Sequence, residues 1–251
     1  MIINKELLHE SKNEGLDNIS VEDRRHFLKM GLALTGVFAG GTILSAVSNV
    51  NKVYACTGEF VEHYPYKPHY SMLLNISLCI DCERCKTACT ETNDVPAYGF
   101  RTMILERNMP HAIGQKREFI PVLCNHCNIP QCTRVCPTKA TYKDKTNGIV
   151  MMDTSKCIGC LSCQMGCPYN ARYFHEEKMA VDKCNFCFDT RLSKGKKTTA
   201  CASSCPTGTR LFGDMSDPAD AVYRQVHQLE KPVWVLRPEA GTKPNVFYTK
   251  S

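Results

Sequence analysis

The longest apolar stretch of the chain, from Met30 to Val47, lies near the amino terminus and contains four glycines. It approaches the ~18–20 residues that span a bilayer, but its glycines and moderate hydrophobicity favour a cleaved signal peptide. Arg24 and Arg25 precede the stretch, and the small-residue pattern at 53–55 is typical of a cleavage site. We therefore expect residues 1–55 to be an export signal, with a retained membrane anchor as the alternative.

The two arginines indicate the export route. The segment DRRHFLK resembles the twin-arginine motif, with Asp23 where serine or threonine is more usual. Cys56 follows the predicted cleavage site and loosely resembles a lipoprotein acceptor, but Tyr54 is a poor fit to that motif. We expect Cys56 to be an unligated residue at the start of a linker, 56–70, with lipidation as the alternative.

Short strands are predicted in three later segments. Residues 98–123 are rich in β-forming residues and are interrupted by MPHAIGQ, which predicts a hairpin. An Asn-Gly turn begins the segment 147–153, which predicts a short strand. Residues 233–248 predict two strands joined by a Gly-Thr-Lys-Pro turn.

One helix is predicted close to the carboxy terminus. Asp217-Pro218 has the pattern of an N-cap followed by proline at the first helical position, and the helix is expected to reach about Glu230. Its apolar face would comprise Val222, Val226 and Leu229.

The cysteine content changes the interpretation of the whole chain. Of 17 cysteines, none precedes Cys56, and the other sixteen form four groups that each close with Cys-x3-Cys. The gaps are x2, x2, x3 in the first and third groups, x2, x4, x3 in the second, and x2, x13, x3 in the fourth. The groups are Cys79, Cys82, Cys85 and Cys89; Cys124, Cys127, Cys132 and Cys136; Cys157, Cys160, Cys163 and Cys167; and Cys184, Cys187, Cys201 and Cys205.

Three kinds of site compete for these groups. Zinc sites use Cys-x2-Cys pairs two at a time and need neither a third nearby cysteine nor a Cys-x3-Cys ending. Disulfides are plausible in an exported protein, but they do not explain a pattern repeated four times. A [4Fe–4S] cluster does explain it, because Cys-x2-Cys-x2-Cys wraps three corners of a cubane and a distant cysteine supplies the fourth. We therefore expect four [4Fe–4S] clusters, with iron bound by all sixteen cysteines.

The closing cysteines carry two further expectations. Proline follows three of them, at Pro137, Pro168 and Pro206, and is expected to begin a short helix. In two-cluster ferredoxins the fourth cysteine of each group ligates the other cluster. Applied here, this exchange predicts cluster 1 on Cys79, Cys82, Cys85 and Cys205; cluster 2 on Cys184, Cys187, Cys201 and Cys89; cluster 3 on Cys124, Cys127, Cys132 and Cys167; and cluster 4 on Cys157, Cys160, Cys163 and Cys136.

Charge and motifs limit the other functions. The net charge of +6 resides entirely in residues 56–251, where cluster sites of negative charge would offset it. No Ser/His/Asp constellation, phosphate-binding glycine loop or dinucleotide fingerprint is present. His126 lies inside the second group, and we expect it to support the ligands or lie at the surface, because four cysteines already suffice. We therefore expect no catalytic residues and no nucleic-acid partner.

The cysteine groups and their flanks resemble a known family over roughly residues 70–250. The stretches that carry the resemblance include YSMLLNISLCIDCERCKTACTETN, LCNHCNIPQCTRVCPTKAT, CIGCLSCQMGCPYNAR, DKCNFC and LRPEAGTKPNVFY. They are similar to the four-cluster ferredoxin-like B subunits of molybdopterin oxidoreductases that reduce tetrathionate, polysulfide, thiosulfate or dimethyl sulfoxide. They are also similar to the periplasmic iron–sulfur protein encoded with formate-dependent nitrite reductase.

The resemblance implies a non-catalytic electron-transfer subunit in the periplasm, associated with the membrane through a partner. An integral membrane subunit that oxidises quinol would donate electrons, and a molybdopterin catalytic subunit, preferably a sulfur-compound reductase, would accept them. The alternative acceptor is a multihaem cytochrome c that reduces nitrite or sulfite. A zinc- or cluster-bearing regulatory module is a remote alternative, because the export signal and the absence of a basic helix argue against it.

These expectations define an α+β fold of two interleaved bacterial-ferredoxin-like 2[4Fe–4S] modules with short hairpins. After the signal and linker, residues 71–117 and 183–213 are the predicted outer module, and residues 118–182 are the module inserted into it. Residues 214–251 are the predicted carboxy-terminal helix and hairpin.

The twin-arginine interpretation is testable with Arg24→Lys combined with Arg25→Lys. Iron–sulfur assembly needs reduced thiols, so clusters should be inserted in the cytoplasm before a route for folded cargo exports the protein. We expect the double variant to accumulate in the cytoplasm as a cluster-loaded precursor, measured by cell fractionation and iron analysis. Normal export of this variant contradicts the interpretation.

Overall fold

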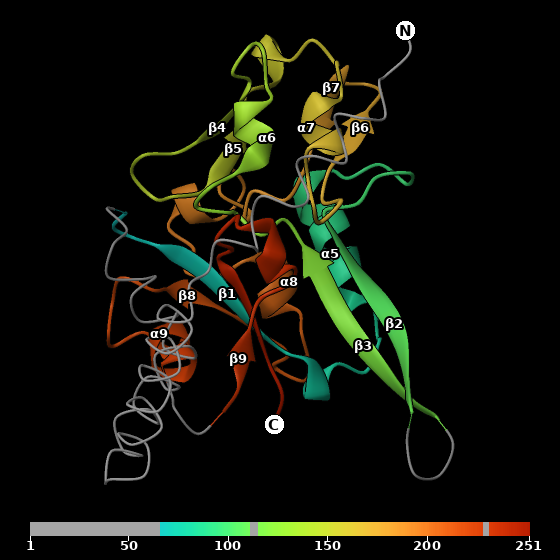
Figure 1. Cartoon of the computed structure of the whole chain (residues 1–251), viewed down its shortest axis with the longest axis vertical. Helices are drawn as coiled ribbons and strands as arrows, with labels where there is room; N and C mark the ends of the chain where they lie inside the picture. Colours follow the sequence, from blue (N-terminus) through green and yellow to red (C-terminus); the bar gives the residue numbers. More distant parts are fainter. Residues whose placement is uncertain (1–65, 111–114, 228–230) are drawn as a thin grey trace, which may run out of the picture. The chain divides into compact units, whose positions relative to one another are not determined.

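The computed structural model describes residues 66–110, 115–227 and 231–251 (Figure 1). The predicted export signal, including Arg24 and Arg25, lies outside the described residues, as does Cys56. Within the ranges that are described, no helix is both long enough and apolar enough to cross a membrane.

A four-stranded sheet brings together segments that are far apart in the sequence. Its order is β8-β1-β10-β9, formed by β1 (Tyr70–Asn75), β8 (Arg210–Asp214), β9 (Val233–Trp234) and β10 (Val246–Thr249). β1 is antiparallel to β8 and parallel to β10, and β10 is antiparallel to β9. Both faces of β1 are covered, which explains its continuous apolar run.

The two faces of this sheet meet two separate cores. Met72 and Leu74 point into the larger core, which contains cysteines from three of the four groups. Leu73 alternates to the other face and packs with Phe247 and Val222 in a smaller core. The sheet therefore joins the region of the cysteines to the carboxy-terminal part of the chain.

The carboxy-terminal helix, α9 (Ala221–Val226), begins later than predicted. Val222 and Val226 are buried as expected, whereas Leu229 lies outside the described residues. Asp220 caps the helix by accepting a hydrogen bond from the Val222 N–H at 2.7 Å. The predicted cap was wrong because the Asp217 carboxylate accepts a hydrogen bond from the Ala219 N–H, 2.9 Å long, in a turn that precedes the helix.

The predicted strands are confirmed, with one difference in their connections. β2 (Thr102–Pro110) pairs antiparallel with β3 (Gln115–Leu123) in the expected hairpin, and β5 (Val150–Met152) is the expected strand after the Asn-Gly turn. β9 (Val233–Trp234) and β10 (Val246–Thr249) also pair antiparallel, but the connection is longer than the predicted Gly-Thr-Lys-Pro turn and includes a 3₁₀ turn, η4 (Pro238–Ala240).

Each cysteine group contributes one short helix and leads toward a strand. The helices are α5 (Arg84–Asn93), α6 (Gln131–Arg134), α7 (Ser162–Met165) and α8 (Ala200–Ser203). The third cysteine of each group is the second residue of its helix. Two small antiparallel sheets, β4-β5 and β6-β7, complete the described elements with three 3₁₀ turns: β4 (Thr141–Lys143), β6 (Tyr173–His175), β7 (Ala180–Asp182), η1 (Ile76–Leu78), η2 (Thr154–Lys156) and η3 (Leu192–Lys194).

The expectation of helices after the Cys-Pro pairs was wrong. Pro137, Pro168 and Pro206 all lie in turns, and the helices precede the closing cysteines. In the turn after Cys136 the backbone N–H groups of Thr138, Ala140 and Thr141 interact with the Cys136 sulfur. A helix begun at the proline would direct those N–H groups along its own axis instead.

The mixture of helices and strands is an α+β architecture. β1 and β8 pair across the intervening chain, and the two small sheets form within it. The predicted boundary between residues 117 and 118 falls inside β3.

The new position of the α9 cap is testable with Asp220→Ala. The variant loses the bond from Val222 and a second bond from the Asp214 N–H to Oδ2, 3.0 Å long. We expect the free energy of unfolding to fall by about 1 kcal/mol or more. This change would be measured as a fall of about 2–4 °C in the unfolding temperature of the cluster-loaded chain. Asp217→Ala is the matched control and should change this temperature less. Equal falls would argue against Asp220 as the cap.

Candidate metal centre

The predicted cluster 1 cysteines surround one pocket. Cys79 and Cys82 come from the loop before α5 and Cys85 from its first turn, whereas Cys205 comes from the turn before β8. Pairing of β1 with β8 brings these two segments together across more than a hundred residues. Arg210, the first residue of β8, lines the same pocket.

The predicted cluster 3 cysteines surround a second pocket built in the same way. Cys124 and Cys127 come from the segment between β3 and α6, Cys132 lies in α6, and Cys167 follows α7. The helices α6 and α7 contact each other, which places the fourth cysteine beside the first three. Arg172 lines this pocket and therefore occupies the place that Arg210 has in the first.

The predicted cluster 2 cysteines meet between α5 and α8. Cys89, Cys184, Cys187 and Cys201 are all buried, and Cys184 interacts electrostatically with the other three. Asn93, one turn after Cys89 on α5, directs its Nδ2 at two sulfurs, 3.6 Å from Cys89 Sγ and 3.5 Å from Cys187 Sγ. An amide donor between two sulfurs is an arrangement suited to an iron–sulfur site.

The predicted cluster 4 cysteines have the same range of exposure as those of the predicted cluster 1. Cys163 is buried, Cys160 is exposed, and Cys157 and Cys136 are partly buried. Cys136 interacts electrostatically with Cys160, which connects the end of the second group with the third.

All four groups share one backbone turn. The residue two places after the first cysteine has a positive φ in every group: Asp81 at 56°, His126 at 44°, Gly159 at 67° and Phe186 at 53°. Three of these residues are not glycine, so the left-handed conformation carries a steric cost that the fold has to offset. The turn aims backbone N–H groups at sulfur: the Gly159 N–H lies 3.5 Å from Cys157 Sγ, and the Phe186 N–H lies 3.4 Å from Cys184 Sγ.

The electrostatics of the cysteines fit a metal cluster. Burial raises the pKa of Cys89 and of Cys127 to about 12, and burial also raises the pKa of Cys184. A metal ligand has to be a thiolate, and buried thiolates require compensating positive charge. Iron would supply that charge here, because iron–sulfur clusters are bound by cysteine thiolates.

Two closing cysteines receive unusually many donors. Burial tends to raise the pKa of Cys205, but hydroxyl and backbone donors of Thr207 and Thr209 lower it overall. The Thr207 hydroxyl lies 3.6 Å from Cys205 Sγ. Cys136 has the equivalent neighbour, with its sulfur 3.7 Å from the Thr138 hydroxyl.

The residues described by the structure do not place three His, Cys, Asp or Glu side chains closely enough to hold a single metal ion. The ligands of a four-iron cubane attach to four different iron atoms and do not have to converge in that way.

Aromatic rings connect the two buried sites. His126 and Phe186 stack with centroids 3.8 Å apart, and each lies directly before a cysteine, Cys127 and Cys187 respectively. Cys184 also interacts electrostatically with Cys124, so the predicted clusters 2 and 3 are neighbours. The stack marks the contact between the predicted outer and inserted modules.

His126 is fully buried, with 0% of its surface exposed, so a surface position was wrong. Its Nδ1 accepts a hydrogen bond from the Val150 N–H at 3.1 Å. Burial lowers the pKa of His126, and the nearby cations Lys183, Lys143 and Arg172 lower it further. The ring is therefore neutral and supports the loop that carries Cys124 and Cys127.

Four buried or partly buried cations near the cysteines were not predicted. They are Lys143, Arg172, Lys183 and Arg210, and each interacts electrostatically with at least two cysteines. One sequence signal existed for the arginines, because Cys-Pro-x3-Arg occurs at both Cys167–Arg172 and Cys205–Arg210. The lysines carry no comparable signal, because neither belongs to that motif.

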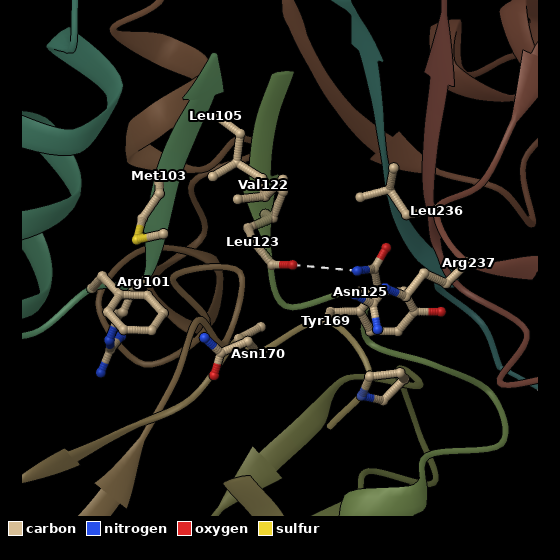
Figure 2. Close-up of a pocket in the computed structure, with 13 residues that line it drawn as sticks. Arg101, Met103, Leu105, Val122, Leu123, Asn125, Tyr169, Asn170, Leu236 and Arg237 are labelled. Atoms are coloured by element: carbon tan, nitrogen blue, oxygen red, sulfur yellow. Dashed lines mark hydrogen bonds between the residues drawn. The ribbon is translucent and has the colours of Figure 1, made fainter. Parts of the chain in front are cut away.

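An apolar cavity of about 350 Å³ adjoins the second pocket (Figure 2). Met103, Leu105 and Val122 of the hairpin form one side, and Leu236 and Arg237 approach from the other. Asn125, which follows Cys124, also lines it. A group bound in this cavity would therefore lie beside the predicted cluster 3.

Comparison with known proteins agrees with the class of site that the cysteines define, a ferredoxin-like iron–sulfur centre. A family model described as a 4Fe-4S dicluster domain matches residues 115–215. The B subunit of tetrathionate reductase from Salmonella typhimurium is 40% identical over 181 residues, which cover 71% of each protein. An NrfC homologue of Haemophilus influenzae is 39% identical over 234 residues, or 92% of this chain and 96% of that protein. The B subunit of polysulfide reductase from Wolinella succinogenes is 38% identical over 184 residues, or 71% and 92% respectively.

The chain therefore belongs to the family of iron–sulfur subunits that includes NrfC and the B subunits of tetrathionate reductase and polysulfide reductase. The resemblance predicted from the cysteine groups is confirmed.

The pocket around Cys205 predicts that the iron losses caused by two substitutions in the same site do not add. Cys82→Ala and Cys205→Ala each remove a ligand from one site, so each should cost at most about four iron atoms. Because both changes damage the same cluster, the double variant should lose no more iron than the worse single variant. Cys205→Ala combined with Cys187→Ala is the matched control, and its losses should add. Additive losses for Cys82 and Cys205 would refute the shared site.

Proposed function

We propose that this chain is a periplasmic electron-transfer subunit with four [4Fe–4S] clusters, bound by the sixteen cysteines in the exchanged pairing described above. Electrons would pass from a membrane subunit that oxidises quinol to a periplasmic molybdopterin reductase, with a sulfur-compound reductase favoured. The names of two relatives, which are B subunits of tetrathionate reductase and polysulfide reductase, support that choice of acceptor.

The observation that carries the proposal is the exposure of the cysteines in the four predicted sites, because the first and fourth sites each contain an exposed cysteine and the second and third contain none. Cys82 in the first site and Cys160 in the fourth are exposed, whereas every cysteine of the second site is buried. The interaction of Cys184 with Cys124 connects the second site to the third. Electrons could thus enter and leave at the surface while the inner clusters stay shielded from solvent.

The two accessible ends also carry exposed apolar side chains. Ile80 is 61% exposed beside the first site, and Ile158 and Met165 are 66% and 87% exposed beside the fourth. Isolated exposed apolar residues are common, but these flank the two accessible cysteines. Exposed apolar side chains beside an accessible cysteine suit docking of one redox partner at each end.

The proposed arrangement is interleaved. The outer module would hold clusters 1 and 2, and the inserted module would hold clusters 3 and 4. Pairing of β1 with β8 supports an outer module that closes around the inserted one.

The alternative acceptor is a multihaem cytochrome c that reduces nitrite or sulfite. It is retained because this sequence resembles the iron–sulfur protein encoded with formate-dependent nitrite reductase. The cluster chain and its two ends are the same in both versions, and only the partner differs.

Anoxic purification of the tagged full chain from periplasm and membranes, followed by metal and haem analysis, tests the proposal. We expect about sixteen irons and sixteen sulfides per chain, together with a co-purifying large subunit that contains molybdenum. A co-purifying subunit with covalent haem instead would select the alternative acceptor. Zinc in place of iron, or about four irons per chain, would refute the four-cluster proposal.

A further inference from the structure

Two buried arginines occupy equivalent places in the predicted outer and inserted modules. Arg172 is 1% exposed and Arg210 is 4% exposed. Each follows a closing cysteine by five residues, at the point where the next strand begins or is about to begin. The repeat makes two independent examples of one arrangement within a single chain.

One edge of each guanidinium is held by a threonine at the start of a strand. Arg210 donates from Nη2 to the Thr102 hydroxyl at 2.8 Å, and Arg172 donates from Nη1 to the Thr141 hydroxyl at 3.2 Å. Thr102 and Thr141 are each the first residue of a strand, β2 and β4 respectively. These bonds fix the direction of both side chains.

One terminal nitrogen of each guanidinium has no partner within hydrogen-bond geometry, although each guanidinium interacts with the sulfur of a predicted cluster ligand, Cys132 for Arg172 and Cys85 for Arg210. The free nitrogens are Nη2 of Arg172 and Nη1 of Arg210, and both are buried. A buried guanidinium N–H without an acceptor is costly. Both arginines line the four-cysteine pockets, where the sulfides and thiolates of a cluster would accept such bonds.

Each arginine also lies between the two predicted sites of its own module. Arg210 interacts electrostatically with Cys85 and Cys205 of cluster 1 and with Cys201 of cluster 2. Arg172 interacts with Cys132 and Cys124 of cluster 3 and with Cys163 of cluster 4.

We propose that Arg172 and Arg210 are positioning residues that raise the reduction potentials of the clusters in their own modules, through one N–H bond to sulfur and one positive charge. The inference rests on the four clusters of the proposed function. One-electron reduction takes a [4Fe–4S]²⁺ cluster to [4Fe–4S]⁺ with an electron from an external donor. The reduced cluster has more negative charge, so a nearby cation and N–H donor stabilise it more than the oxidised one.

Potentiometric EPR titration of the full chain, with dithionite as reductant, tests the inference in Arg172→Gln and Arg210→Gln. In Arg172→Gln we expect two of the four centres to move to more negative potential and the other two to stay. In Arg210→Gln the complementary pair should move. Arg117→Gln is the matched control, because Arg117 is an exposed residue of the hairpin that pairs with Glu106, and it should move none.

Lysine replacements separate the effect of the positive charge from the effect of the guanidinium N–H donors. Arg172→Lys and Arg210→Lys keep the positive charge, so they should move the same pairs of centres by a smaller amount. They also take the place of any glutamine variant that fails to retain iron. A merely structural role would lower iron content without moving the potentials of the centres that remain.

Two results would overturn the inference while leaving the proposed function intact. The first is unchanged potentials in variants with wild-type iron content. The second is movement of the same centres by both arginine replacements. By contrast, a wild-type chain without four centres would refute the proposed function itself.

Discussion

Burial of many thiolates in one small core is the constraint on which this structure depends. Cys184 lies deep in the protein, and the pKa values of Cys89 and Cys127 are raised to about 12, so isolated thiolates at these positions would be unfavourable. Three features of the chain counter this cost: backbone N–H groups in left-handed turns, hydroxyl and amide donors such as Thr207 and Asn93, and buried cations such as Arg210. The metal would add the largest positive charge. Because predicted ligand cysteines from three of the four groups belong to the larger core, the apolar core and the cofactor sites occupy the same region.

What could be predicted from the sequence followed from local chemistry. Cys-x2-Cys spacing reports a turn that one segment can make by itself, and the hairpin at 102–123 reports alternating side chains within one segment. The errors arose where a distant partner decided the outcome. Pro206 was predicted to begin a helix, but the N–H groups that follow it interact with the sulfur of Cys205, and the segment forms a turn. His126 was assigned without knowledge of Phe186, sixty residues away, which stacks on it and buries it.

The missed cations illustrate the same limit. Arg172 and Arg210 form a repeated motif only when the two Cys-Pro sequences are aligned with each other, and their threonine partners lie in segments that follow other cysteine groups. Arg101 and Asp182 likewise form a largely buried ion pair, 2.9 Å long, between the hairpin base and the strand that leads to Cys184. No single segment contains these pairs, because each fastens one cysteine group to another.

The pocket shared by Cys79 and Cys205 also has a consequence for the order of biosynthesis. The site around Cys124 has all its lining cysteines once the ribosome has passed residue 167, but the site around Cys79 is incomplete until residue 205 has been made. The first predicted ligand cysteines to emerge therefore belong to one of the last sites to close, and three of its thiols stay open while more than a hundred further residues are translated. During that interval the nascent chain depends on a reducing environment and on protection from wrong metals. The predicted export signal would emerge before all of them, so its recognition would have to wait for the far end of the polypeptide.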